Sequence, residues 1–400
     1  MARRFTPGLR SIGVALAVVV YLWCWVFLGH SFYTHRGSSD AVWYQPFGLQ
    51  MRAGQLPYRD FAVEYPPGAL PVFIAPTYVG HPDNLADYEK WFGRLMCALG
   101  LGSLLLVAGA RPPAWGLALV AVSPLLIGSL APERFDLWPT TLTIAAVVAL
   151  LGDRHRLGWG LLSAALAAKI YPVTLVPLAA VWTIRRRGPA ALAACAAVAL
   201  AVAAVAFGPF VVLAPHQLWA SLWGQASRPM QIESLAASYL MTFGHPRTEF
   251  VYQSFSIEGH DTLSTLEFVA QLGTLLCVWI AFARGAPSQQ RFVRYAAASA
   301  CAFVAFGTVF SPQYLVWLVP LIALVRGYRG MVATAMLVAS FILTNSWYGT
   351  PRFDAYIATG RYGWVLLMRN IIVVLLAALL AAPSKRVRLP LPRLRTGRPG

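Results

Sequence analysis

A single carboxylate, Asp40, stands among small and aromatic residues in the stretch SSDAVW at positions 38–43. An aspartate can serve as a general base, because its carboxylate can take the proton from a hydroxyl group that attacks a reacting carbon. It can equally open or cap a short helix, together with the serines before it. Spacing alone leaves both interpretations of Asp40 open.

A second polar stretch, PYRDFAVEYPP at positions 57–67, holds two carboxylates between prolines. Glu64 and the neighbouring Tyr65 are candidates for contact with a polar ligand, and Glu64 could instead brace the loop. Asp60 is expected to brace the loop, because Arg59 beside it can neutralise its charge.

Lys169 stands in the stretch KIYP at positions 169–172, between two short apolar segments. A lysine inside a bilayer costs at least about 2.5 kcal/mol unless it is paired or hydrated. It could therefore meet a phosphate group, or it could reach the surface or pair with Asp136 or Glu133. No other charged side chain is expected to be buried, and Arg134 and Asp136 are expected to form a structural turn.

Two later motifs add an arginine, a glutamate and a glutamine. Residues 228–234 read RPMQIES, in which Arg228 could bind phosphate and Glu233 could hold the hydroxyl groups of a ligand. The alternative for this pair is an ion pair within a structured loop, which contributes little by itself. Residues 311–317 read SPQYLVW, in which Gln313 could reach a hydroxyl group of a ligand while the Ser-Pro pair turns the chain.

Metal and disulfide chemistry have no motif in the sequence. The five cysteines all lie inside apolar runs, and no CxxC or HExxH spacing occurs. The histidines are scattered without ligand spacing. We therefore expect no metal site, no cofactor and no disulfide framework.

The elements that must position these residues are membrane-spanning helices. The 400 residues are 58% hydrophobic and 12% charged, with mean hydropathy +0.60, whereas soluble domains carry about 25% charged residues. A span needs about 20 apolar residues, or fewer in a short hairpin. We predict an all-α polytopic membrane protein with about twelve spans, at 12–30, 91–110, 114–131, 137–151, 157–169, 172–184, 189–213, 264–283, 292–310, 313–325, 330–347 and 364–382.

Charge placement predicts the orientation of these spans. Twenty of the 32 basic residues fall in one set of alternate connections and at the two ends, whereas fourteen of the 15 acids fall on the other side. The positive-inside rule then places both ends in the cytoplasm. The net charge of +17 is accordingly read as a topology signal, with no nucleic acid as partner. We expect one domain over 1–383 in a bacterial plasma membrane, outer loops at about 30–90 and 214–263, and a basic cytoplasmic tail at 384–400.

An outer-loop aspartate followed by PYRDF and EYPP, with the later KIYP, RPMQIES and SPQYLVW motifs, resembles glycosyltransferase family 87 of the GT-C superfamily. The resemblance implies a GT-C-like fold and transfer of mannose from a polyprenyl-phosphate sugar without a metal ion. It assigns Asp40 the role of general base in an inverting displacement. It also implies that Lys169 and Arg228 bind the donor phosphate, and that Glu64, Tyr65, Glu233 and Gln313 contact the sugar or the acceptor.

Two functions from different classes fit a membrane protein of this kind. The first is an α-mannosyltransferase acting on an extracytoplasmic glycolipid or lipoglycan, with its active site outside the cytoplasm and with membrane lipid around it. The second is a transporter or flippase of lipid-linked sugars, which would carry charges buried mid-span in several helices and show internal repeats. The crowding of acids on one face favours the enzyme.

Overall fold

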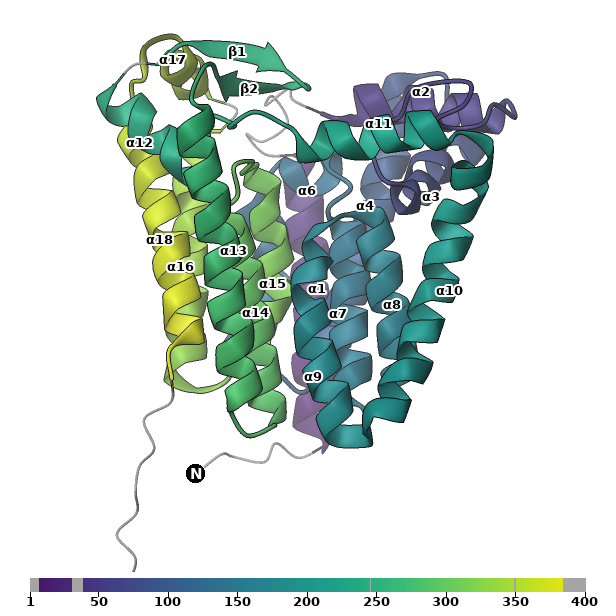
Figure 1. Ribbon diagram of the computed structural model, residues 1–400, viewed down its shortest axis with the longest axis vertical. Coiled ribbons are helices and arrows are strands. Elements are labelled where there is room, and N and C mark those ends of the chain that lie inside the picture. Colours follow the sequence, from purple (N-terminus) through teal and green to yellow (C-terminus); the bar gives the residue numbers. More distant parts are fainter. Residues whose placement is uncertain (1–6, 31–38, 245, 349, 384–400) are drawn as a thin grey trace, which may run out of the picture.

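The computed structural model describes residues 7–30, 39–244, 246–348 and 350–383. Within these residues, six helices are long and apolar enough to cross a bilayer, and they stand roughly upright in Figure 1. The other candidate segments form shorter helices. The six long helices are α1 (Pro7–Leu28), α4 (Leu85–Gly109), α10 (Pro189–Leu213), α13 (Asp261–Arg284), α16 (Gly327–Asn345) and α18 (Gly363–Ala381).

The remaining predicted spans coincide with shorter helices that lie beside the long ones. Two of these predicted spans begin with a proline-containing 3-10 helix that continues directly into an α-helix. The structure therefore supports a multi-pass, mostly α-helical membrane protein. Six of the described helices have spanning length, and the total of twelve spans stays a prediction. The shorter elements are α5 (Ala114–Ile127), α7 (Leu137–Leu151), α8 (His155–Ala168), η4 (Tyr171–Leu175), α9 (Val176–Arg187), α14 (Gln289–Ala305), η5 (Pro312–Trp317) and α15 (Leu318–Ala323).

A layer of short elements covers one end of the helices, at the top of Figure 1. Its antiparallel hairpin, in which Thr248 pairs with Ile257, and its helix at 351–359 were not predicted. The apolar stretch at 68–76, too short to span, dips into the protein and buries Phe73 completely. The layer contains α2 (Ala41–Arg52), η2 (Pro67–Ala69), α3 (Leu70–Ile74), η3 (Ala75–Tyr78), α6 (Leu130–Glu133), α11 (Pro215–Ala226), α12 (Leu235–Phe243), β1 (Thr248–Val251), β2 (Ser254–Ile257) and α17 (Pro351–Thr359).

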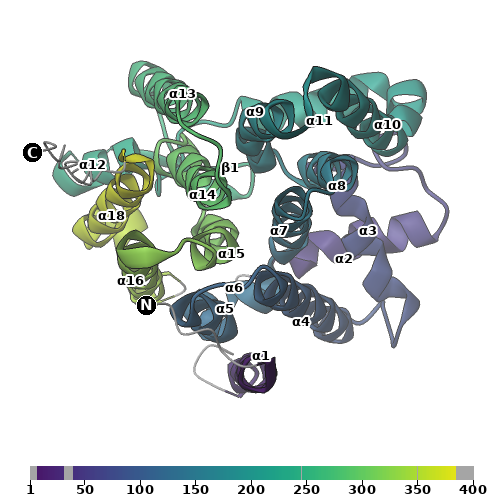
Figure 2. The same ribbon diagram turned by 90° about the horizontal axis from the view of Figure 1, so that it is seen from below.

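The helices seen from below in Figure 2 differ sharply in how many of their residues are buried. In α14, every residue from Phe292 to Ala302 is buried, and most of them are alanine or serine. Small side chains let neighbouring helices approach closely, which compensates for the weak hydrophobic drive between helices in lipid. In α10, by contrast, Cys195 is the one buried residue, so this helix presents its apolar surface outward.

Arginines at the other end of the molecule bind the carbonyl groups at helix ends. Arg294 donates to the carbonyls of Leu380 (2.9 Å) and Ala382 (2.5 Å), Arg326 donates to that of Arg111 (2.6 Å), and Arg10 donates to that of Ala108 (2.9 Å). The last carbonyls of a helix lack partners within it and attract cations. These predicted topology signals therefore also contribute to the structure.

Labelling of introduced cysteines from outside the cell would test the predicted orientation. In a variant without the five native cysteines, Gln55→Cys should react with a membrane-impermeant maleimide on intact cells, because Gln55 is exposed in the layer that carries α2. Ala286→Cys, exposed at the opposite end, should react only after permeabilisation. The reverse pattern would contradict the placement of both chain ends in the cytoplasm.

Candidate active site in the outer layer

Asp40 immediately precedes α2. It makes no capping hydrogen bond; the hydroxyl of Ser39 accepts the Ala41 N–H instead (3.2 Å). The Asp40 carboxylate forms an ion pair with Arg134 and accepts a hydrogen bond from the Tyr44 hydroxyl (3.1 Å). The contacts therefore favour a role for Asp40 other than helix capping.

The turn between α6 and α7 carries two charged side chains on either side of Phe135. Arg134 faces Asp40, whereas the buried Asp136 binds Lys169, with 2.6 Å between Oδ1 and Nζ. The same Oδ1 accepts a hydrogen bond from the indole N–H of Trp317 (2.7 Å). This turn therefore joins the Asp40 region to Lys169.

Aromatic rings surround the Lys169 ammonium group. Its nitrogen lies 4.6 Å from the ring centre of Phe135, 5.2 Å from that of Tyr314 and 5.1 Å from that of Trp317. Ring faces attract a cation, so they help to hold the charge where water is scarce. The Lys169 side chain keeps 16% of its surface exposed, so a ligand can still reach it. One alternative from the sequence, the pairing of Lys169 with Asp136, is confirmed as a contact.

Arg228 brings a third cation to the same region. It lies 3.7 Å from the Glu64 carboxylate and donates to the carbonyl of Tyr252 (3.1 Å). Both Arg134 and Arg228 are close enough to Lys169 to repel its charge. The Nε of Arg228 is buried without a hydrogen-bond partner, which leaves a donor available for a ligand.

Tyr65 lies among the aromatic rings next to Asp40. Its ring meets those of Tyr44 and Phe135 edge to face, at centroid distances of 5.6 and 5.3 Å. Its carbonyl accepts a hydrogen bond from the Tyr58 hydroxyl (2.5 Å). These contacts fix the PYRDFAVEYPP loop next to Asp40.

Glu233 and Gln313 differ in how available their side chains are. Glu233 is 3% exposed, and it pairs with Arg369 of α18 at 3.1 Å. Burial raises the pKa of the Glu233 carboxyl to about 7, and the charge of Arg369 opposes that rise. The Gln313 side-chain oxygen is buried without a hydrogen-bond partner. The geometry therefore favours Gln313 over Glu233 as a ligand for hydroxyl groups.

Asp60 and Arg59 form the expected brace within the PYRDFAVEYPP loop. The guanidinium lies 2.8 Å from the carboxylate, and Asp60 also accepts the Leu56 N–H (2.7 Å). The hydrogen bond from Arg59 lowers the pKa of the Asp60 carboxyl. Both side chains are partly exposed and make no contact with the Asp40 group in the described residues.

Three residues that contact the site residues were not assigned to the site from the sequence, namely Arg134, Asp136 and Arg369. Asp136, Arg294 and Arg369 are buried, whereas Lys169 is half-buried, so the expectation that Lys169 alone is buried was wrong. The signal for Arg369 was visible, because it is an arginine inside the apolar run 364–382. Across the described ranges, no cluster of three or more metal-binding side chains occurs.

The fold and this site define a multi-pass membrane protein whose polar groups converge at one end of its helices. The family model of glycosyltransferase family 87 matches residues 63–312, more than half of the sequence. The chain therefore belongs to glycosyltransferase family 87, whose fold is GT-C-like. No curated protein matches the sequence. The matched range includes Lys169, Arg228 and Glu233, whereas Asp40 and Arg369 lie outside it.

Proposed function

We propose that this glycosyltransferase moves a hexose, with mannose as the leading candidate, from a polyprenyl-phosphate sugar to an extracytoplasmic glycolipid or lipoglycan. Its site would face away from the cytoplasm in a bacterial plasma membrane. The domain would extend over 1–383, and the basic tail at 384–400 lies outside the described residues. No cofactor is part of the proposal.

The observation that carries this proposal is the convergence of one partly exposed carboxylate with three cations. Asp40 is 23% exposed, and Arg134 stabilises its ionised form, which is the form that can accept a proton. A carboxylate offers about four lone-pair positions, so the bonds from Arg134 and Tyr44 leave room for an acceptor hydroxyl. Asp40 would take the proton of that hydroxyl as its oxygen attacks the anomeric carbon. Direct displacement of the lipid phosphate from this carbon would invert the anomeric configuration.

The leaving group of such a reaction is a lipid phosphate, which gains negative charge as the bond to the sugar breaks. Fixed positive groups that face this charge stabilise the transition state. We assign this role to Lys169 and Arg228. Glu64, Tyr65 and Gln313 are proposed to contact the sugar or the acceptor, and Glu233 is proposed to anchor its loop.

A transporter receives less support from the positions of the buried charges. Arg369 lies in the first half of α18 and pairs with a residue of the outer layer. Arg294 lies near the opposite end, where it binds carbonyls of residues 380 and 382. Neither arginine stands midway along its helix, where an ion or substrate pathway would need it.

Transfer of radiolabelled mannose from polyprenyl-phosphate-mannose into lipid-extractable product, in membranes that contain the wild-type protein, tests the proposal. Label in the product that depends on expression of this chain would support both sugar and donor class. Absence of transfer from this donor, with transfer from another polyprenyl-phosphate sugar, would reject mannose and keep the class. Movement of the intact donor across the membrane without transfer would instead establish the flippase.

Arg228→Ala should weaken use of the donor. We expect kcat/KM for the polyprenyl-phosphate sugar to fall by about 10- to 100-fold, because a charge-assisted bond to phosphate is worth about 1.5–3 kcal/mol. Arg228→Lys should retain part of the activity, since it keeps the charge and loses the paired donors. Initial rates at varied donor concentration give both values. Equal kcat/KM for wild type and Arg228→Ala would remove Arg228 from the phosphate site.

A further inference from the structure

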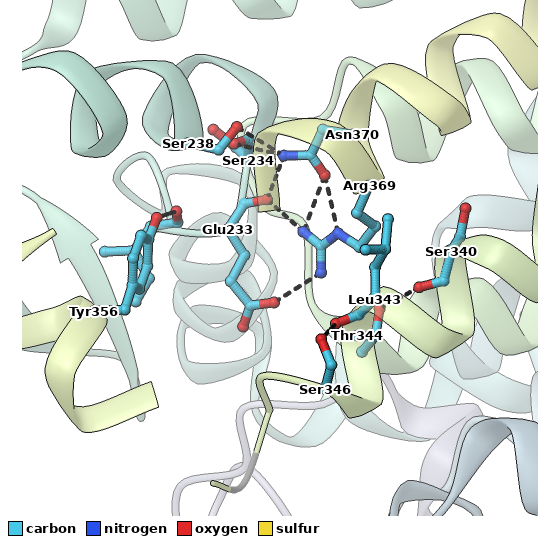
Figure 3. Close-up of polar contacts among 11 residues, drawn as sticks. Glu233, Ser234, Ser238, Ser340, Leu343, Thr344, Ser346, Tyr356, Arg369 and Asn370 are labelled. Atoms are coloured by element: carbon cyan, nitrogen blue, oxygen red, sulfur yellow. Dashed lines mark hydrogen bonds and ion pairs between the residues drawn. The ribbon is translucent and has the colours of Figure 1, made fainter. Parts of the chain in front are cut away.

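Two polar residues, Arg369 and Asn370, interrupt the otherwise apolar helix α18 in its outer half. Arg369 is 1% exposed and Asn370 is completely buried. Burial of such groups is costly unless every polar atom finds a partner. Their presence therefore calls for a specific set of contacts, which Figure 3 shows.

Both side chains bind the backbone of the segment at 233–234 (Figure 3). Arg369 donates to the Glu233 carbonyl (2.8 Å) and pairs with its carboxylate (3.1 Å). The amide nitrogen of Asn370 lies 3.1 Å from the Glu233 carbonyl oxygen, 3.0 Å from that of Ser234 and 2.9 Å from the Ser238 hydroxyl. The Asn370 oxygen accepts two bonds from the guanidinium. The pair therefore acts as one rigid unit.

Three other elements fix the same segment. The Tyr356 hydroxyl of α17 donates to the Ile232 carbonyl (2.7 Å). The Glu267 carboxylate of α13 accepts from the Ser234 hydroxyl and from the Ala236 N–H, both at 3.0 Å. Strand β2 adds the bond from the Ile257 N–H to the Met230 carbonyl (2.8 Å). Residues 230–236 are thus held on several sides, and Arg228 extends from their first end.

We propose that Arg369 and Asn370 are positioning residues, which hold the segment at 230–236 so that Arg228 stays beside Glu64 and Lys169. The importance of that placement rests on the function proposed for Arg228 above. Both residues lie beyond the range matched by the family model, so the site depends on the last helix as well. The guanidinium also lies 4.0 Å from the ring centre of Phe310, which fixes its orientation.

Hydrogen exchange on the purified full-length protein in lipid nanodiscs tests the positioning without any substrate. Asn370→Ala removes two donors from the segment, so peptides covering 228–238 should exchange about tenfold faster, with peptides covering 41–52 unchanged. Ser340→Ala is the matched control, because Ser340 is equally buried in the neighbouring helix α16 and bonds only within that helix (3.0 Å to the Met336 carbonyl). Unchanged exchange at 228–238 in Asn370→Ala would overturn the proposal.

A double-mutant cycle with Arg228→Ala separates positioning from a general loss of folding. Asn370→Ala should lower kcat/KM for polyprenyl-phosphate-mannose about tenfold in the wild-type background. The same change should have little further effect in the Arg228→Ala background. Equal effects in both backgrounds would overturn the link to Arg228. Arg369→Lys, which keeps the charge, gives a milder second variant if Asn370→Ala yields too little folded protein.

The two experiments fail in distinguishable ways. Faster exchange at 228–238 together with no sugar transfer by the wild type would reject the proposed function and leave the role of α18 in holding the segment intact. Normal transfer by the wild type together with unchanged exchange in Asn370→Ala would reject the positioning role alone.

Discussion

Asp40→Asn is expected to abolish sugar transfer, with a loss of about 10²- to 10⁴-fold in kcat, the usual contribution of a general base. The substitution preserves the size of the side chain and an oxygen that can accept the Tyr44 hydrogen bond. It removes the ability to take a proton from the acceptor hydroxyl. Rates of label transfer from polyprenyl-phosphate-mannose, normalised to the amount of folded protein, measure the effect.

Asp60→Asn is the matched control for this experiment. It makes the same chemical change in the same outer loop, at a carboxylate that is partly exposed and bound to Arg59. We expect its rate to stay within about twofold of wild type, because a surface ion pair contributes about 0–1 kcal/mol. Full activity in Asp40→Asn would exclude Asp40 as the base, and Glu64 would become the next carboxylate to test.

Lys169→Met is expected to damage both folding and transfer. It leaves Asp136 buried, 3% exposed at its side chain, with the Trp317 indole as its remaining partner. Removing one member of a buried ion pair costs about 3–5 kcal/mol. The loss of the ammonium group should also reduce transfer by at least about 100-fold, because it removes the charge that we propose faces the departing phosphate. Thermal unfolding and transfer rates report the two effects.

A double variant that combines Lys169→Met with Asp136→Asn separates the two effects. Removing the negative charge with the positive one should restore most of the stability, and the introduced amide oxygen can still accept the Trp317 hydrogen bond. Transfer should stay as low as in Lys169→Met, because the phosphate contact is still absent. Recovery of transfer in the double variant would show that Lys169 only neutralises Asp136.

The helical segments could be predicted because hydropathy alone defines them. The segment 189–213 was predicted with the bounds that α10 has, and 137–151 with those of α7. The number of spans could not be predicted in this way, because a short apolar helix and a spanning helix share one composition. The hairpin at 248–257 and helix α17 are held by contacts with other elements. Such contacts produce no regular spacing of apolar residues in the sequence, so the two elements could not be predicted.

The sequence predicted several residues of the candidate site, but it did not predict which residues contact one another there. Asp40 was singled out with the motifs that follow it, and Lys169 was singled out by type, since a lysine between apolar segments is rare. Their partners, Arg134 and Asp136, stand 94 and 33 residues away. They come together because α4 packs against α2, α6 and α7, and because α7 packs against α8. Residue spacing cannot show that the turn at 134–136 contacts Asp40 through Arg134 and Lys169 through Asp136.

We expect lipid to cover the outward-facing apolar surface of α10 and so to help hold the segment that leads to Arg228. Cys195 is the one residue that α10 buries, and a single side-chain bond, from the Ser163 hydroxyl to the Ala199 carbonyl (2.7 Å), ties it to α8. The chain continues from α10 through α11 to Arg228, and Gln225 at the end of α11 donates to the Glu64 carbonyl (2.8 Å). Solubilisation that strips bound lipid would loosen this arm at its base, so a detergent extract would lose donor affinity that a reconstituted bilayer restores.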